Sequence, residues 1–483
     1  MRSAILGYAC GVAWFFGNCY WVYQTMYKYG GLPEAASLGI LVLFSLYLGI
    51  YLGAFGVGFA SLRRYAGDRA ALMFSPFLWV AIELARARIT GFPWDLLGYT
   101  QVDNSLLTRL APVTGTMGLS LIVALGNALW FWKPRKYFAG PALALCLAST
   151  TLLGHSFEKP EEVPTAAAVL LQDNLSVGAD IQGQRESGAD LLQNFSSLSL
   201  HPRIAPQLGS IASGSKNGPV PPDLVAWPEA PTPFLDADPT LRSALGAVAR
   251  AERAPVVVQT EGTGASRNEA GRFDQFVSAS FFLPDGSYAG RYDKMHLVPF
   301  GEYTPYKQLF FFAGHLLDQL TLVPGKQRRL FSENGHRYGV FICYESIFGD
   351  EIREFALHGA QVLVNLSDDG WYGDTSAPWE HLDMARMRAI ENHRWLLRDT
   401  NTGLTASIDP EGRIVAALPR HVRDAIEVPF GYEGDLTFYT RHGDWIGWLC
   451  AILVVSVLIG SALQQRYPRP SAKRSRPEDG KLN

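Results

Sequence analysis

Apolar segments of membrane-spanning length dominate the first 155 residues of the chain. Five of them have about the length that a helix needs to cross a bilayer, and a sixth closes the chain. They cover residues 4–23, 36–62, 71–84, 110–132, 137–153 and 445–463. The third is the weakest, because Glu83, Arg86 and Arg88 interrupt its end. The first has no convincing small-residue cleavage site, so we expect it to remain as an anchor.

The pattern changes near Pro164 to short apolar runs separated by turn residues and helical stretches. The runs are typical of strands and cover residues 169–172, 224–227, 256–259, 276–282, 339–343 and 362–366. Helical patterns cover 239–252 and 376–397, and Pro-Asp-Gly and Pro-Glu-Gly turns at 284–286 and 410–412 predict hairpins. This alternation predicts an α/β layered domain. The polar stretch 196–222 is rich in Ser, Gly and Pro and predicts a mobile surface loop.

The chain therefore divides into four parts: a membrane domain of five helices (1–155), a polar domain (160–430), a C-terminal membrane helix (443–464) and a basic tail (465–483). Basic residues near segment ends predict the orientation, because they favour the cytoplasmic side. If every segment crosses, one side holds Arg2, Arg63, Arg64, Arg69, Lys133, Arg135, Lys136, Arg466, Arg469, Lys473, Arg474 and Arg476. Lys28, Arg86, Arg88 and Arg109 weaken this bias without reversing it. We expect both termini in the cytoplasm and the polar domain outside it.

Composition agrees with a membrane part joined to a soluble part. Hydrophobic residues make up 48% of the chain and charged residues only 18%, less than in a typical soluble protein. The net charge of -3 and the lack of an extended basic patch before the tail exclude nucleic acid as a partner.

Two loops on the expected outer side, 27–33 and 90–101, are rich in aromatic residues. They are typical of an aromatic belt at the headgroup level, and they are equally suited to line a lipid entrance. Glu83 and Arg86 are three residues apart, so on a helix they can pair with each other. We expect Arg88 to contact a charged headgroup.

Cys343 stands at the end of the apolar run 339–343, with Glu345 two positions later. The other four cysteines, Cys10, Cys19, Cys146 and Cys450, lie in the apolar segments. Cys343 therefore has no evident disulfide partner and no cysteine co-ligand for zinc. Two interpretations stay open at this point, a small core residue and a catalytic thiol.

Two further segments carry residues that thiol chemistry needs. Glu229 follows the run 224–227, and Lys294 lies in Tyr292-Asp293-Lys294-Met295-His296. A thiol needs a base to become a thiolate, and a tetrahedral oxyanion needs a positively charged donor. Each motif alone is also typical of an ordinary strand end.

Together and in this order, Glu229, Lys294 and Cys343 resemble the Glu-Lys-Cys triad of the nitrilase superfamily, whose fold is an α/β/β/α sandwich. With the membrane segments added, nearly the whole chain resembles the apolipoprotein N-acyltransferase family. The motifs that carry this resemblance are Trp227-Pro228-Glu229-Ala230, residues 294–302, Ile342-Cys343-Tyr344-Glu345, Trp371-Tyr372-Gly373 and residues 384–389. The resemblance implies that Glu229 is the general base, Lys294 the oxyanion stabiliser and Cys343 the nucleophile. It also implies supporting, substrate-binding or lid roles for Glu302, Tyr344, Glu345, Trp371 and Tyr372.

The same resemblance implies transfer of a fatty acyl chain from a membrane phospholipid, through a cysteine thioester, to the α-amino group of a diacylglyceryl-modified lipoprotein cysteine. It implies no metal and no cofactor. Both substrates carry chains that are costly to extract from a bilayer, so we expect a multi-pass protein of the bacterial inner membrane with its site at the membrane surface. The apolar run 309–312 is either an arm that enters the lipid or an ordinary core helix.

Two features depart from the family pattern. The family usually has eight membrane helices, whereas this chain begins at what resembles the third. Asp368 stands where the family usually shows Asn, and we expect it beside the site and not in it. Two other functions stay open: a membrane-tethered amidase that hydrolyses a small C–N substrate, and a transporter or scaffold with an inactive domain. The intact triad argues against the second.

Overall fold

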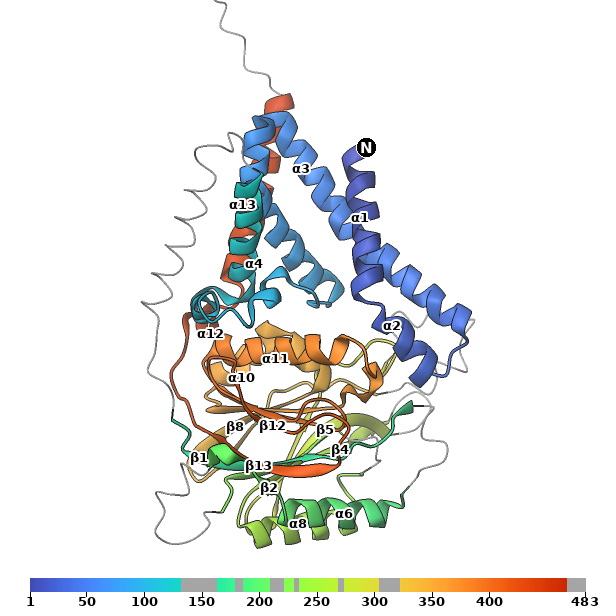
Figure 1. Cartoon of the computed structure of the whole chain (residues 1–483), viewed down its shortest axis with the longest axis vertical. Coiled ribbons are helices and arrows are strands. Elements are labelled where there is room, and N and C mark those ends of the chain that lie inside the picture. The colour runs from blue at the N-terminus through green and yellow to red at the C-terminus, as the bar shows by residue number, and fades with distance from the viewer. Residues whose placement is uncertain are drawn as a thin grey trace, which may run out of the picture.

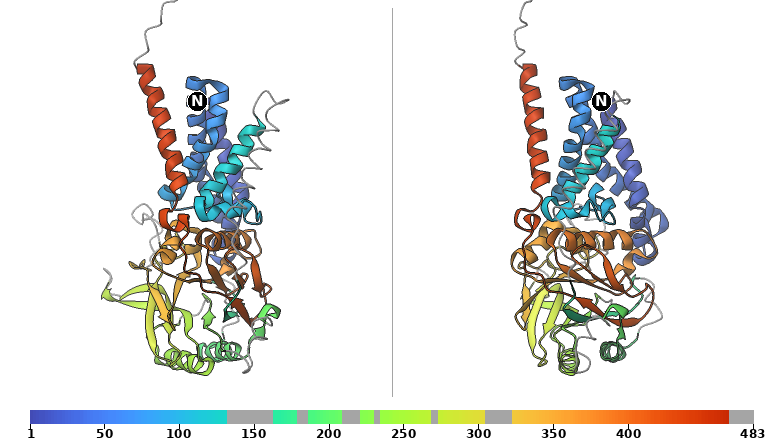
Figure 2. Two further views of the ribbon diagram at one scale, coloured as in Figure 1. Left: turned by 90° about the vertical axis from the view of Figure 1, so that its left-hand side faces the viewer. Right: turned by 60° about the vertical axis from the view of Figure 1, so that its left-hand side comes forward.

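The computed structural model describes residues 1–131, 163–178, 186–208, 221–229, 234–267, 273–303 and 322–466. Apolar helices form one end of the molecule, and two stacked sheets with flanking helices form the other (Figure 1). Both views in Figure 2 show all the membrane-type helices on one side of the sheet domain. The two halves predicted from the hydropathy pattern are therefore distinct bodies that meet along one surface.

Two β-sheets form the α/β domain that the sequence predicts. The first has the strand order β2-β13-β1-β3-β4-β5-β6, and the second has the order β12-β11-β10-β9-β8-β7. The strands of the first sheet are β1 Ala166–Gln172, β2 Arg203–Ile204, β3 Leu224–Trp227, β4 Val256–Arg267, β5 Phe273–Phe282, β6 Tyr288–Asp293 and β13 Asp424–Phe430. Those of the second are β7 Leu330–Glu333, β8 His336–Ile342, β9 Val362–Ser367, β10 Trp395–Thr400, β11 Ala406–Ile408 and β12 Ile414–Ala417.

Helices cover the outer face of each sheet. α6 (Gly188–Leu200) and α8 (Pro239–Glu252) pack on the first sheet, while α10 (Gly349–Leu357) and α11 (Ala377–Asn392) pack on the second (Figure 1). Buried side chains from both sheets, such as Leu170 and Val364, form one core between them. Strands such as β1, β3, β8 and β9 are buried on both faces, which explains their uninterrupted apolar sequences. The predicted α/β/β/α sandwich is confirmed.

Two predicted elements have different bounds. The helix expected over 376–397 ends at Asn392, because His393 adopts a left-handed φ of 50° and the chain then enters β10 in the second sheet. The loop expected over 196–222 is partly regular: α6 continues to Leu200, and β2 pairs with β13. The predicted helix 239–252 and the hairpins β5–β6 and β11–β12 are confirmed.

The membrane half contains α1 (Arg2–Asn18), α2 (Trp21–Gln24), α3 (Glu34–Ala85), α4 (Ala111–Trp130) and α13 (Trp445–Arg466). α3 reverses at Gly67, whose φ of 81° is non-helical. The rings of Phe55 and Trp79 are 5.6 Å apart, whereas a straight helix would separate these positions by about 36 Å. α3 is therefore a hairpin whose two arms correspond to the predicted segments 36–62 and 71–84.

Two helical stretches in the described part of the chain are long and apolar enough to cross a membrane, Glu34–Thr90 and Thr108–Trp130. The pair Arg2–Asn18 and Trp21–Tyr29, bent by 50°, becomes a third if it forms one span, and Trp445–Gly460 is a shorter apolar helix. The predicted segment 137–153 lies outside the described residues. Six spans therefore stay a prediction, as do the domain limits.

The charged residues near the end of α3 bind protein groups. Arg86 is buried and donates to the backbone carbonyls of Phe92 and Asp95, while Glu83 accepts from the Trp79 indole at 2.9 Å. Glu83 and Arg86 thus form hydrogen bonds with other groups, and no hydrogen bond or ion pair joins their two side chains. Arg88 pairs with Asp350 on α10 and with Asp444 before α13. The expectation of a headgroup contact for Arg88 is wrong for this conformation, because two carboxylates occupy its guanidinium.

Helix α11 carries the main polar contact between the two halves. The α4 backbone is non-helical at Gly115, whose φ is 65°. Glu391 of α11 accepts from the N–H of Thr116 at 2.9 Å and from its hydroxyl at 2.6 Å, and Arg388 pairs with Glu391 at 2.9 Å. All three side chains are almost fully buried. At the break in α4, the N–H of Thr116 is therefore a donor that helps to hold the sheet domain against the membrane helices.

Candidate active site

One edge of the sandwich collects the three predicted triad residues. Glu229 follows β3, Cys343 follows β8, and Asp368 follows β9, which is parallel to β8. β6 is antiparallel to β5, and β5 is antiparallel to β4, so β6 has the direction of β3 and delivers Lys294 to the same edge. Carboxyl ends of parallel strands meet at one edge, which is where active sites of layered α/β folds are commonly found.

Lys294 lies between two carboxylates. Its Nζ is 2.6 Å from Glu302 Oε1 and 3.5 Å from Glu229 Oε1, and its side chain is fully buried. Burial alone would lower the pKa of Lys294, but the carboxylates of Glu229 and Glu302 outweigh it and raise that pKa. The lysine is therefore an ammonium ion at neutral pH. Glu302 also accepts from the N–H of Val298 at 2.8 Å, so its position is fixed.

The carboxyl group of Glu229 lies beside the thiol of Cys343. Burial raises the pKa of Glu229, although Lys294 opposes this. Burial and the Glu229 carboxylate raise the pKa of the Cys343 thiol well above its ordinary value. In the resting site the thiol therefore keeps its proton, and the Glu229 carboxyl group lies beside it.

The backbone at Cys343 is strained. Cys343 has a left-handed φ of 50°, and it is a free, buried cysteine at the start of the short helix η8 (Cys343–Ile347). A non-glycine residue in this region costs of order 1 kcal/mol or more, and such strain is concentrated at functional sites. This geometry turns the thiol out of the strand direction, toward the edge that holds Glu229 and Lys294.

Glu345 ties the nucleophile strand to the lysine segment. Its Oε2 accepts from the N–H of Ile342 at 2.8 Å, and its Oε1 accepts from Met295 N–H and the Tyr292 hydroxyl, each at 2.7 Å. The predicted supporting position of Glu345 is consistent with these contacts. Tyr344 points the other way, and its hydroxyl donates to the carbonyl of Gly91 at 3.3 Å. It therefore contacts the loop of residues 91–96, which comes after α3 and the short helix η2 (Arg86–Thr90) and is called the loop after α3 below.

The two predicted aromatic residues differ in exposure. Trp371, on η9 (Asp369–Tyr372), is 42% exposed. Tyr372 is buried against Trp21 and Trp94, with ring centroids at 5.3 and 5.9 Å. Tyr372 therefore belongs to the aromatic contact between the domains, and after burial the nearby Cys343 and Asp369 raise the pKa of its hydroxyl well above its ordinary value, whereas Trp371 is exposed to solvent.

Asp368 meets Cys343 with its backbone N–H, while its carboxyl group bonds other residues and lies close enough to Glu229 to feel its charge. Its Oδ1 accepts from Gly370 N–H at 2.9 Å and its Oδ2 from the Asn401 amide at 3.1 Å. A backbone hydrogen bond from Asp368 lowers the pKa of Cys343, which places this N–H beside the sulfur. Burial and Glu229 raise the pKa of the Asp368 carboxyl well above its ordinary value.

Sequence reasoning did not find a fully buried group that lies behind Cys343: His381 on α11, Asp369 on η9 and Arg398 on β10. No local spacing links these residues, since three elements bring them together. Their one sequence signal is the charge itself, because Asp369 comes shortly after the mainly apolar β9 and Arg398 follows the apolar start of β10.

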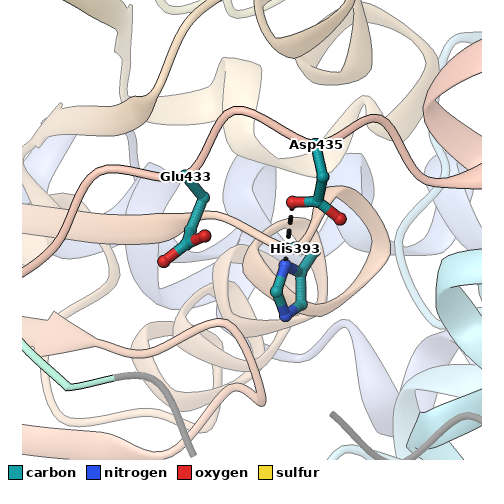
Figure 3. A group of neighbouring side chains, drawn as sticks. All are labelled: His393, Glu433 and Asp435. Carbon is teal, nitrogen blue, oxygen red and sulfur yellow. Dashed lines mark hydrogen bonds and ion pairs between the residues drawn. The ribbon is translucent and has the colours of Figure 1, made fainter. Parts of the chain in front are cut away.

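A group with metal-ligand chemistry lies away from this edge (Figure 3). Ligand atoms of His393, Glu433 and Asp435 lie within 4.8 Å of one another. Asp435 is 3.2 Å from His393 Nδ1 and 3.5 Å from Arg394, so a guanidinium already offsets part of its charge. These contacts hold the link after β13 to the end of α11.

Two cavities lie where the domains meet. One, of about 290 Å³, has apolar walls from α1 and both arms of α3, including Phe15, Leu52 and Trp79. The other, of about 250 Å³, is lined by His296, Tyr344 and the loop after α3. The second cavity adjoins the segments that carry Lys294 and Cys343.

Comparison with known proteins agrees with this division of the chain. Residues 1–129 match the family model described as apolipoprotein N-acyltransferase N-terminal domain, and residues 193–428 match carbon-nitrogen hydrolase. The chain is 32% identical over 463 residues to the apolipoprotein N-acyltransferase of Geobacter metallireducens, covering 92% of this chain and 84% of that protein. It is 32% identical over 471 residues to the protein of that name from Methylococcus capsulatus, covering 94% and 86%.

Among solved structures, similar chains include amidases. A variant of the Nesterenkonia AN1 amidase from the nitrilase superfamily has a TM-score of 0.40 and 18% identity, over 58% of this chain and 95% of that chain. Another structure of an amidase from Nesterenkonia sp. has a TM-score of 0.40 and 17% identity, over 59% and 97%.

Proposed function

The chain belongs to the apolipoprotein N-acyltransferase family, and from this premise we propose that Cys343, Glu229 and Lys294 perform its acyl transfer. The donor is a membrane phospholipid, and the acceptor is the α-amino group of the diacylglyceryl-modified first cysteine of a lipoprotein. The observation that carries the proposal is the buried Lys294 ammonium, held between Glu229 and Glu302 beside a strained Cys343.

In the first half-reaction Glu229 takes the proton of the Cys343 thiol, and the thiolate attacks the ester carbonyl of the phospholipid. Lys294 and backbone N–H groups stabilise the oxyanion. The tetrahedral intermediate then breaks its C–O ester bond. Glu229 returns the proton to the departing alkoxide, so lysophospholipid leaves and an acyl thioester stays on Cys343.

In the second half-reaction the lipoprotein amine attacks the thioester carbonyl. Glu229 removes a proton from the attacking nitrogen, the C–S bond breaks, and the thiol regains its proton. An amine attacks a thioester more readily than it attacks the parent ester, and a site shielded from water limits hydrolysis. The buried side chains of Lys294 and Cys343 are consistent with such shielding.

A lipid donor suits the place of the site. The 250 Å³ cavity beside His296 and Tyr344 also touches the loop after α3, and the apolar cavity lies among the membrane helices. A phospholipid ester can reach this boundary while its chains stay among apolar groups, which avoids a cost of about 0.8 kcal/mol per exposed CH₂.

The orientation proposal places the catalytic domain outside the cytoplasm. The N-terminus, the turn of α3 that carries Arg63, Arg64 and Arg69, and the end of α13 all lie at the far end of the helices from the sheet domain (Figure 1). Basic residues favour the cytoplasmic side. Their grouping at one end supports the proposed orientation.

The decisive experiment is intact-protein mass spectrometry of the purified full chain after incubation with phospholipid and no acceptor. We expect one acyl adduct on the parent and none on Cys343→Ala or Cys343→Ser. Adding a diacylated lipopeptide should remove the adduct and add the mass of one acyl chain to the peptide. An amidase that hydrolyses small C–N substrates would instead leave both the phospholipid and the peptide unchanged.

Substitution of the two supporting charges should separate their roles. Glu229→Gln and Lys294→Ala should lower turnover by roughly 10² to 10⁴-fold, the range for a lost base or oxyanion donor. An adduct that persists in Cys343→Ala, or an active parent that never carries one under quenched conditions, would require another nucleophile or direct transfer between the lipids.

A further inference from the structure

The carbonyl group of Cys343 meets a buried histidine. His381 Nε2 lies 3.1 Å from the Cys343 carbonyl oxygen and 2.7 Å from the Ser346 hydroxyl. The left-handed φ of Cys343 turns this carbonyl out of the β8 ladder, so it needs a partner elsewhere. His381 is the side chain that supplies a contact to it among the described residues.

His381 is itself fixed by a buried ion pair. Burial lowers the pKa of His381, so the neutral ring carries one N–H: Nε2 donates it to the Cys343 carbonyl, and Nδ1 accepts from Arg398 Nη2 at 3.0 Å. The same Nη2 donates to both oxygens of Asp369, at 3.0 and 2.8 Å. The side chains of all three residues are fully buried. Trp94 of the loop after α3 stacks on the imidazole with centroids 5.9 Å apart and planes at 16°. The ring can neither turn nor shift without breaking a charged contact or this stack.

The same ion pair also fixes the other side of the sulfur. Asp369 is bonded to Asp368 in the chain, and the backbone N–H of Asp368 lies beside the Cys343 sulfur. The Arg398–Asp369 pair therefore holds both the carbonyl of the nucleophile, through Arg398 and His381, and the peptide that faces its thiol, through Asp369.

We propose that His381, held by Asp369 and Arg398, is a positioning residue for Cys343 that fixes the thiol between Glu229 and the backbone N–H of Asp368. It touches no substrate atom. Its effect is to keep the strained backbone of the nucleophile in one conformation, so that the sulfur is already aligned when the ester arrives. The inference rests on the proposed function for the reaction that Cys343 performs. The alignment of the thiol does not depend on that reaction, because it is a property of the protein without substrate.

The test compares three variants of the full chain in detergent. His381→Leu keeps much of the volume and removes both nitrogens, and His381→Gln keeps a donor near the position of Nε2. His393→Asn is the matched control, because His393 is a second buried histidine, at the end of the same helix, that contacts Asp435 away from the site. Asparagine also tolerates the left-handed backbone there.

Two rates are measured well below the unfolding temperature of each variant: alkylation of Cys343 by iodoacetamide as a function of pH, and acyl loading from phospholipid. For His381→Leu we expect both to fall, loading by about 10²-fold as for a nucleophile displaced by an ångström, with an altered pH midpoint of alkylation and an unchanged KM for phospholipid. His381→Gln should recover most of the loss, and His393→Asn should match the parent in both rates.

A merely structural histidine would give another pattern. His381→Leu would then unfold at a lower temperature but would alkylate and load at the rate of the parent per folded molecule, with the same pH midpoint, and this result would overturn the proposal. If the parent itself takes up no acyl chain, the proposed function fails, and the iodoacetamide rates still decide the positioning role.

Discussion

Asp173 and Asp399 are two fully buried carboxyl groups near the junction of the two sheets. Burial raises the pKa of each well above its ordinary value; Arg423 opposes this at Asp173, and the neighbouring Asp173 adds to it at Asp399. Both groups are therefore protonated in the folded protein over a pH range in which the unfolded chain would ionise them. Folding then takes up protons, and stability falls as pH rises above about 4.

Asp399→Asn tests this linkage. The amide cannot ionise, so the free energy of unfolding of the variant relative to the parent should increase as pH is raised from 5 to 8, by up to roughly 1.4 kcal/mol per pH unit for one proton. The measurement is unfolding of both proteins across this pH range. The control is Asp285→Asn in the exposed β5–β6 turn, where hydrogen bonds with Ser287 lower the pKa of the carboxyl. That variant should show no gain at high pH. A parent and an Asp399→Asn variant with parallel pH profiles would contradict the prediction.

Asp368→Asn tests the departure from the family pattern. Because the carboxylate faces Gly370 and Asn401 while only the backbone N–H faces Cys343, we expect turnover within several-fold of the parent, measured as acyl transfer to a lipopeptide. A loss of roughly 10²-fold, the size of a lost oxyanion donor, would mean that the carboxyl group takes part in catalysis.

The sequence locates the three residues of the proposed triad at one edge of the sandwich, because each follows a strand inside a short motif, and the resemblance implies their three roles. Glu302 and Glu345 were placed near the site on the same basis, and both contact the segments that carry the triad. His381, Asp369 and Arg398 could not be predicted, because their pairing exists only after β10 and α11 have packed behind β8. A buried charge in an apolar run signals that a partner exists, but not which one.

At the scale of single elements, the sequence locates apolar runs better than their ends. The helix 239–252 has an Asp238 cap and a proline at its start, and its bounds are confirmed. Trp395 to Leu397 continued the helical pattern of α11 in sequence but forms a strand, because the left-handed His393 ends the helix without a glycine or proline to announce it. The Gly67 turn of α3 was implied by the gap between two apolar segments.

The docking of α11 on α4 gives an element-scale prediction. Glu391→Leu removes the acceptor of Thr116 and leaves Arg388 buried beside no carboxylate, so it should destabilise the protein by about 3 kcal/mol or more. Glu391→Gln keeps an acceptor and should cost less. The measurement is thermal unfolding in detergent, with Asp285→Asn in the exposed β5–β6 turn as a control for general effects of charge removal. Equal unfolding temperatures for Glu391→Leu and the parent would show that the contact is dispensable.

For the whole molecule, the predicted orientation has a direct test. A reporter fused after Gln464 should be active when the reporter is one that works in the cytoplasm and inactive when it is one that works outside. Arg2 and the α3 turn lie at the same end as this fusion point, so a reporter at either terminus should agree. Activity of the outside-type reporter after Gln464 would reverse the proposed orientation.

The break in α4 at Gly115 has a consequence for which substrates can react. Glu391 holds the sheet domain at that break, and Trp94 and Arg88 bond the same domain at other points, so these contacts set the height of Cys343 along the membrane helices in this structure. The enzyme would then select an ester by its depth in the leaflet and not by the length of the chain beyond it. Bilayer thickness differs by a few ångströms among natural membranes. The rate at which Cys343 is acylated by the same donor phospholipid, present in trace amount, should therefore differ between vesicles with thin and with thick bilayers. A longer acyl chain on the donor, within one kind of vesicle, should change that rate less.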